Sequence, residues 1–138
     1  MAVYSSLGSF DLNSNVLSYY VAGTSTTASS TTETIVATMT IPQSAIGTNG
    51  RVLIDIGAGC VGDANTSTIK LKKGGSEVQS WTLGGTQVDD NPGSGLPYVE
   101  TSVDSSAGDV VYTVTVKNSI SAGTYKTKFF GCKMLAIK

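Results

Sequence analysis

Histidine is absent from this 138-residue sequence, and its absence removes several chemistries at once. Histidine is the commonest general base, the usual activator of a catalytic serine or cysteine, and the commonest zinc ligand. Carboxylate chemistry stays open, since acidic residues could pair in space as in a glycosidase: Asp55, Asp63, Asp89, Asp90, Glu100 and Asp104. Most of them lie in turn-rich segments, where aspartate caps or solvates a loop. We therefore expect no catalytic residues and no enzymatic activity.

Charge is scarce as well, at 14% of the residues, with nine basic and ten acidic side chains. A chain without a basic excess cannot neutralise a phosphate backbone, so nucleic acid is not an expected partner. No stretch approaches the roughly 20 apolar residues of a membrane-spanning helix. The first 15 residues lack the basic start and apolar core of a secretory signal. We expect a soluble protein that contacts no membrane and is not exported.

The sequence has only two cysteines, Cys60 and Cys132, whose spacing fits neither a disulfide framework nor a metal site. We expect both thiols to be reduced and buried, although a bridge between them stays open. The stretch "VDDNPGSG" offers the oxygen ligands of Asp89, Asp90 and Asn91 to a calcium ion. It lacks the alternating spacing of an EF-hand and is also an ordinary turn sequence, so we expect no cofactor and no metal.

Serine, threonine, glycine and valine dominate what is present, and several segments alternate between two faces with the period of a strand. Residues Ile35, Ala37, Met39 and Ile41 share one face of a predicted strand over 34–41. Segments 51–56 and 110–117 alternate in the same way, with Val52, Ile54 and Ile56 opposite Arg51, Leu53 and Asp55 in the first. These patterns predict strands and no long helix.

Residues 67–83 have the pattern of a hairpin, with a tight turn at Gly74 and Gly75. Its first strand points Ile69 and Leu71 inward between lysines. Lys70, Lys72 and Lys73 with Glu77 form a charge cluster, which is typical of a solvated face or a guarded sheet edge. Contact with an acidic patch of a partner is the alternative.

Glycine, serine and asparagine turns separate the remaining segments. We predict a short strand at 17–23, a polar surface loop after it, and a long excursion over 84–106 in which only 97–101 is strand-like. The final segment predicts a strand that kinks at Gly131 and lies inside a sheet. The whole pattern predicts an all-β fold, a jelly-roll-like β-sandwich of about eight short antiparallel strands, in a single domain over 1–138.

The aromatic residues favour burial over ligand binding. Trp81 and the neighbouring Tyr19 and Tyr20 could stack on sugars or bases, but this supply is ordinary for sandwich cores and subunit seams. Low charge combined with spare aromatic side chains predicts a homotrimer, because closed symmetry hides apolar strand faces.

The closing residues, "DVVYTVTVKNSISAGTYKTKFFGCKMLAIK", carry a resemblance. A "Y-x-V-x-V-K" strand, a Ser/Gly turn and a terminal "M-L-A-I-K" strand are similar to the end of the jelly-roll head in small virion proteins of tailed bacteriophages. The resemblance implies a structural protein of the virion, made in the host cytoplasm and usually trimeric. Such proteins decorate the capsid exterior or form the tip of a fibre.

Fibre proteins of this kind carry a long shaft ahead of the head, whereas this sequence shows none, which favours a capsid decoration or cement protein. The major capsid protein is then the expected partner. Residues 1–10, with Val3, Tyr4, Leu7 and Phe10, are the candidate attachment arm, because apolar residues in such an arm can become ordered on binding. The alternative is a receptor-binding tip that contacts a host surface glycan, and a carboxylate-based glycan hydrolase is a third function.

Overall fold

The computed structural model describes residues 16–28, 30–86, 94–121 and 126–138. This part of the chain is all-β, as predicted, and contains no helix that is long and apolar enough to cross a membrane. Its strands are β1 (Val16–Ala28), β2 (Thr34–Ile41), β3 (Gly50–Lys73), β4 (Ser76–Thr86), β5 (Ser94–Val103), β6 (Val110–Asn118) and β7 (Lys126–Ile137).

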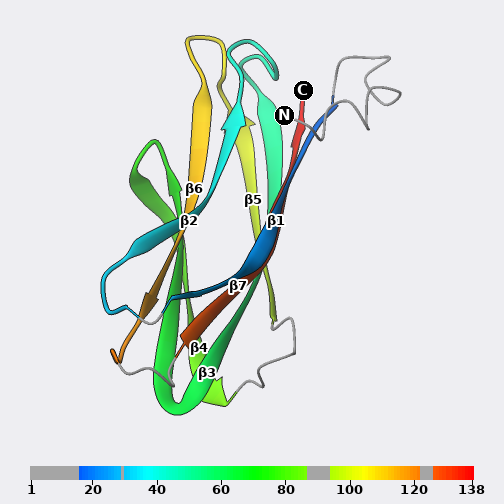
Figure 1. The fold of residues 1–138 in the computed structure, drawn as a ribbon. Helices are drawn as coiled ribbons and strands as arrows, with labels where there is room; N and C mark the ends of the chain where they lie inside the picture. Colours follow the sequence, from blue (N-terminus) through cyan, green and yellow to red (C-terminus); the bar gives the residue numbers. More distant parts are fainter. Residues whose placement is uncertain (1–15, 29, 87–93, 122–125) are drawn as a thin grey trace.

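All strand pairs are antiparallel, and β3 takes part in two separate sets of them. Its first arm, Gly50–Cys60, pairs with β5 and β7, whereas its second arm, from Thr66 onward, pairs with β4 and β6. Val61, at the bend, pairs with both β7 and β4. Between the arms the strand turns back on itself at one end of the molecule (Figure 1). The bend therefore divides the strands into two packed sheets.

We call these the β5 sheet, with the order β1-β7-β3-β5, and the β4 sheet, with the order β2-β6-β3-β4. Counting each arm of β3 as one strand gives eight, in the strand order of a jelly roll. The predicted fold class is confirmed. The predicted number of short strands differs from the seven found, because arms predicted as separate strands form one continuous strand of 24 residues.

Polar side chains buried behind the bend of β3 hold it in place. The Asn65 side-chain amide donates to the Val61 carbonyl at 3.2 Å and to Asn118 Oδ1 at 3.3 Å. The Thr127 hydroxyl, on β7, bonds both Asn118 and Ser67. Because buried polar groups stabilise a fold only when they are paired, this network fixes where the chain crosses between the sheets.

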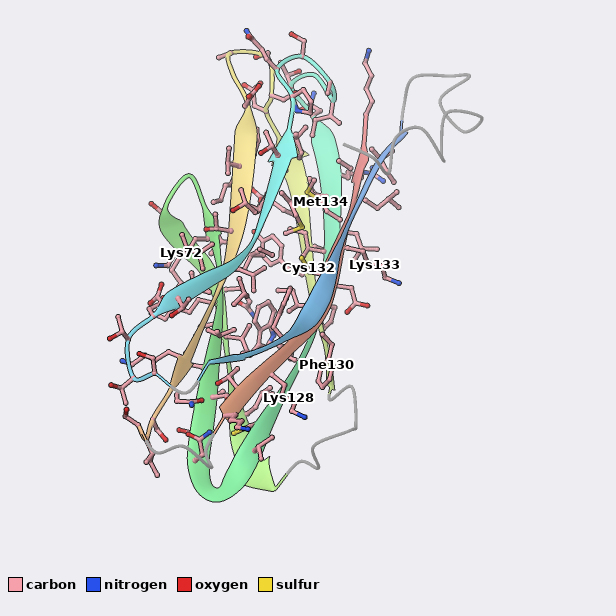
Figure 2. All side chains as sticks on the ribbon, viewed as in Figure 1. Lys72, Lys128, Phe130, Cys132, Lys133 and Met134 are labelled. Atoms are coloured by element: carbon pink, nitrogen blue, oxygen red, sulfur yellow. The ribbon has the colours of Figure 1, made fainter. Side chains whose placement is uncertain are left out.

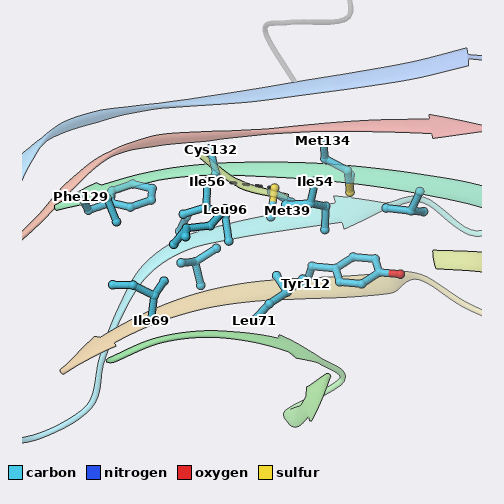
Figure 3. Close-up of a cluster of buried hydrophobic side chains, with 14 of the residues drawn as sticks. Met39, Ile54, Ile56, Ile69, Leu71, Leu96, Tyr112, Phe129, Cys132 and Met134 are labelled. Carbon is cyan, nitrogen blue, oxygen red and sulfur yellow. Dashed lines mark hydrogen bonds between the residues drawn. The ribbon is translucent and has the colours of Figure 1, made fainter. Parts of the chain in front are cut away.

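The core lies between the sheets, as Figure 3 shows for its largest side chains. The predicted alternation holds along β3, where Val52, Ile54 and Ile56 are fully buried. Ile69 and Leu71 point inward from the second arm, and Gly74 and Gly75 make the predicted turn with φ of 55° and 86°. Along β3 the period-two patterns therefore identified the core-facing residues correctly.

Two β-bulges change which side of a strand faces the core. In β7 the register shifts beside Phe130, so Phe129 is buried before the shift and Cys132 and Met134 after it. Gly131, with φ of 134°, makes the predicted kink. In β2 the register shifts between Ile35 and Ala37, which leaves Ile35 63% exposed, although its period places it with the core residues.

Two strands are longer than predicted. β1 continues to Ala28 through residues predicted as a surface loop, because Thr26, Thr27 and Ala28 pair with β7 after a bulge. β5 covers Ser94–Val103 instead of 97–101, since it pairs along the whole first arm of β3. In both cases ladder hydrogen bonds to a strong neighbouring strand override weak local propensity. As predicted, the final strand lies inside a sheet, with β7 between β1 and β3.

Candidate interaction surface

Of the acidic residues for which carboxylate chemistry stayed open, the three whose side chains the structure describes are separated by the fold. Asp55 lies on the outer face of the β5 sheet, Glu100 points between the sheets, and Asp104 bonds the Ser106 amide and hydroxyl in a loop. No group of His, Cys, Asp or Glu suited to a metal ion occurs among the residues that the structure describes. Asp89 and Asp90 lie outside the described residues, as does the side chain of Asp63.

Glu100 is the centre of a network that links the two sheets. Its carboxylate accepts hydrogen bonds from Tyr112 on β6 at 2.6 Å, from Tyr98 on β5 at 3.1 Å and from Lys73 on β3 at 2.5 Å. The Lys73 ammonium also lies 5.9 Å from the centre of the Tyr112 ring. Both carboxylate oxygens are hydrogen-bonded within the protein, so Glu100 acts as an inter-sheet tie.

The electrostatics of this tie follow from its burial and its donors. Burial favours the neutral form of Glu100, but the hydrogen bonds from Lys73 and Tyr112 outweigh it and hold the pKa below its usual 4.5. Burial, followed by the nearby carboxylate charge, raises the pKa of Tyr98 to about 12. Glu100 is therefore ionised and both phenols are neutral at pH 7.

The outer face of the β4 sheet carries the predicted charge cluster. Lys70 bonds Glu77 on β4 at 2.9 Å and lies 3.6 Å from Glu33, which precedes β2 and also pairs with Lys72. The hydrogen bond from Lys72 is the main cause that holds the pKa of Glu33 below its usual value. The lysines thus find their acidic partners within the chain, consistent with a solvated, internally paired face.

The outer face of the β5 sheet is different, because it presents apolar side chains at its centre. Leu53 pairs with Leu135 of β7 on one side and with Val99 of β5 on the other. Leu53 is 44% exposed and Val99 65% exposed. Directly opposed residues of one sheet face lie about 5 Å apart, so these side chains form a continuous apolar row across three strands. We refer to Leu135, Leu53 and Val99 as the leucine row.

A shallow hollow of about 290 Å³ lies beside the leucine row and is lined by Leu53, Asp55, Lys133, Met134 and Leu135. Asp55 of β3 and Lys133 of β7 are register partners, two residues along the strands from Leu53 and Leu135. Figure 2 shows Lys133 directed away from the sandwich, opposite to Cys132 and Met134. The hollow combines apolar side chains of β3 and β7 with the charged side chains of Asp55 and Lys133.

Charged residues flank the leucine row on both sides. Along β3, Arg51 precedes Leu53 by two residues and Asp55 follows it by two, all on the outer face. Neither Arg51, Asp55 nor Lys133 takes part in an ion pair with another described residue. This face therefore combines uncovered apolar surface with charges that lack partners among those residues.

The cysteines are free and buried, as predicted. Cys60 pairs with Thr127 and Cys132 with Ile56, four positions away along β3. At about 3.3 Å per residue this separation of roughly 13 Å exceeds disulfide reach. Cys132 contacts the Met39 sulfur at 3.6 Å in the core, and burial raises the pKa of its thiol to about 12. Both are packing residues.

Several predicted binding residues lie outside the described part of the chain, namely the arm residues Val3, Tyr4, Leu7 and Phe10. Tyr19 and Tyr20 belong to β1, whose backbone alone is described. Trp81 packs against the core, as favoured from the sequence. The leucine row was missed, although the alternation that buries Val52 and Ile54 also places Leu53 between two charges on the outer face.

Comparison with known proteins shows similarity of fold. No protein-family model and no curated protein matches the chain. Among solved structures, the insecticidal delta-endotoxin Cry8Ea1 of Bacillus thuringiensis matches 84% of this chain with a TM-score of 0.58 and 9% identity. A capsid protein of infectious bursal disease virus, Gt strain, matches 88% with a TM-score of 0.54 and 12% identity.

Latent PorU of Porphyromonas gingivalis also matches 88% of the chain, with a TM-score of 0.51 and 10% identity. These proteins are much longer, and the matched part is 20% of the endotoxin, 33% of the viral chain and 12% of PorU. At such low identity the matches establish the β-sandwich architecture, which viral capsid proteins share.

Proposed function

We propose that this protein is a non-enzymatic structural component of a virion that decorates the capsid exterior and stiffens it. The observation that carries the proposal is the strand order, β1-β7-β3-β5 packed on β2-β6-β3-β4, which is the jelly roll used in viral coats. The likeness to a bursal disease virus capsid protein supports a virion. The resemblance of residues 109–138 to small virion proteins supports a tailed bacteriophage.

The side chains support a binding role over catalysis. The most elaborate set of ionisable groups described, around Glu100, is satisfied by the protein's own donors and ties the sheets together. Such a molecule can bind a partner through its surface. A decoration protein binds in this way at many equivalent positions of a capsid lattice. Many copies turn a modest contact into a strong one, because an oligomer that binds one capsid subunit holds its other sites at high effective concentration.

The proposed capsid contact is the arm over residues 1–10, with the major capsid protein as partner. Val3, Tyr4, Leu7 and Phe10 would bury apolar surface in the lattice, and such residues stabilise little until a partner covers them. The contact is tested with virions assembled without the protein and then incubated with purified variants. Tyr4→Ser with Leu7→Ser should prevent binding, whereas the matched pair Ser5→Ala with Ser6→Ala should bind normally.

Genome retention tests the function itself. Virions that lack the protein should release their genomes at a lower temperature or under weaker osmotic shock than complete virions, and added protein should restore them. Equal robustness combined with lost adsorption to host cells would contradict decoration and favour the receptor-binding alternative, with a host surface glycan as ligand. Turnover of a polysaccharide by the purified protein would contradict both.

A further inference from the structure

The outer face of the β5 sheet raises a question that capsid binding by the arm leaves open: what covers the leucine row. Of the large apolar side chains exposed among the described residues, Leu53 and Val99 are adjacent on this face. Leu135 and the hollow beside it extend the apolar area onto β7. Contiguous apolar surface rimmed by charge is typical of a protein contact.

We propose that this face binds the same face of a second copy of the chain, in a two-fold pair. The argument rests on the order of charges along β3, where Arg51 and Asp55 lie at equal distances on either side of Leu53. At about 3.3 Å per residue, each lies roughly 7 Å from Leu53 along the strand. The face is therefore complementary to itself when one copy is turned end over end.

The symmetry axis that fits runs along the leucine row and passes over Leu53. It places Leu53 of one copy on Leu53 of the second copy, and it places Arg51 of each copy opposite Asp55 of the other. A symmetry axis along β3 would instead place Arg51 opposite Arg51 of the second copy, and repulsion between these like charges would disfavour that arrangement. A two-fold contact uses one patch on both partners, as self-complementary charges require.

The surroundings of the row agree with this pairing. Asp55 and Arg51 form no ion pair with another described residue, so each has a charge to offer across the contact. Lys133 would lie over Ile137 of the second copy, the register partner of Arg51, where its methylene stem can cover apolar surface and its ammonium can stay in water.

The size of the face is also adequate. Four strands spaced about 4.8 Å apart, over the length of Gly50–Ala58, present a flat area of roughly 550 Å². Side-chain relief makes the accessible area larger, and a standard interface takes about 800 Å² from each partner. The outer face of the β4 sheet offers no such area, because its lysines and glutamates are paired within the chain.

The first test measures mass by sedimentation equilibrium on the full chain. Wild-type protein should approach twice the 14.2 kDa chain mass. Leu53→Asp should raise the dissociation constant by about tenfold or more, as expected for a central apolar contact. The matched control is Ile35→Asp, an exposed apolar residue of the β4 sheet, which should leave the constant unchanged. Far-UV spectra and Tm report that each variant is folded.

The second test exchanges charges and does not depend on removing apolar surface. Asp55→Arg places arginine opposite Arg51 of the second copy and should weaken the pair by about tenfold. Adding Arg51→Asp restores opposite charges in the reversed order, so the double variant should return to within about threefold of wild type. Recovery is the result expected when the two residues meet across the symmetry axis.

A wild-type mass of one chain at concentrations up to about 1 mM would overturn the proposal. So would a three-chain mass, which the homotrimer prediction gives, or an equal effect of Leu53→Asp and Ile35→Asp. Failure of the double variant to recover would overturn the two-fold geometry. The proposal would be supported if the wild-type protein formed an assembly of six chains and the Leu53→Asp variant formed one of three chains. None of these outcomes depends on whether the protein binds a capsid.

Discussion

The two outer faces of the sandwich are built from the same β3 strand and yet have opposite character. The first arm presents Leu53 between Arg51 and Asp55, and neither charge pairs with another described residue. The second arm presents Lys70 and Lys72, which pair with glutamates of the same chain. The charges on the outer face of the β4 sheet are paired within the single chain, whereas the outer face of the β5 sheet leaves apolar side chains and charges exposed.

The difference shows where a β-sandwich can carry a contact without weakening itself. Both sheets need alternating apolar residues only on their inner faces, so the outer faces are free to vary. Internal ion pairs keep an outer face of threonine and lysine side chains solvated. They also discourage association with another protein through the face or the edge of the sheet. An uncovered row of leucine and valine side chains instead favours association with another protein. The contrast between the two faces can therefore be tested by substitutions on each of them.

The largest expected effect comes from the inner side of the same arm. Ile54→Ala should lower the free energy of unfolding by about 2–5 kcal/mol, because Ile54 is fully buried and its loss leaves a cavity. Leu53→Ala, one residue away, should cost less than about 1 kcal/mol in the monomer. Urea unfolding at low protein concentration measures both. Similar costs would show that Leu53 is part of the fold's core.

The inter-sheet tie should give the next effect. Glu100→Gln keeps the side-chain shape but removes the charge that three donors share, and should cost about 1–3 kcal/mol at pH 7. The folded-state pKa of Glu100 lies below 4.5, so its contribution is present above that pH and is lost as the pH falls through the lower folded-state value. The difference between wild type and variant should therefore shrink below pH 4.5. A constant difference from pH 7 to strongly acidic pH would contradict the ionic role.

The paired lysines of the β4 sheet should matter less. Lys72→Ala removes the ion pair with Glu33 and should cost no more than about 1 kcal/mol, since that contact remains partly exposed. The cost should fall further in 1 M salt, which screens such pairs. Lys117→Ala, an exposed lysine of β6 outside the four ion pairs described, is the control. A larger cost in high salt would contradict this account.

The smallest effect on stability should come from making the two outer faces alike. Leu53→Thr combined with Val99→Thr replaces exposed apolar side chains with the residue that suits an exposed strand, so Tm should change by no more than a few degrees. Binding of a hydrophobic dye such as ANS should decrease. A large drop in Tm in the dilute monomer would show that the row packs within the chain.

The sequence was sufficient to predict the inner faces, because burial imposes a period of two on Val52, Ile54 and Ile56 and on the even-numbered valines of β6. It could not reveal the bulge beside Val36, which exposes Ile35, since nothing local marks a register shift there. The full lengths of β1 and β5 also escaped prediction. Both depend on pairing with strands distant in sequence, which local propensity does not report.

The candidate site was harder to foresee than the fold. The lysine cluster stood out in the sequence, but its acidic partners Glu33 and Glu100 are distant along the chain, and only the sheet order brings them near. The leucine row joins residues 53, 99 and 135, each ordinary in its own strand. Its significance appears only in the cross-strand register, which a single sequence leaves undetermined.

The pairing of β1 with β7 has a mechanical consequence. Val16 is the register partner of Ile137, so these two positions lie side by side at one end of the β5 sheet. A force that pulls on them in opposite directions loads the hydrogen bonds of the β1–β7 ladder one after another, as in opening a zipper, and not all at once. Hydrogen bonds of an antiparallel pair run perpendicular to the strands, so at any moment only the few bonds nearest the loaded end carry the force. A molecule tethered through these two positions would yield first between β1 and β7, while the β4 sheet stayed intact.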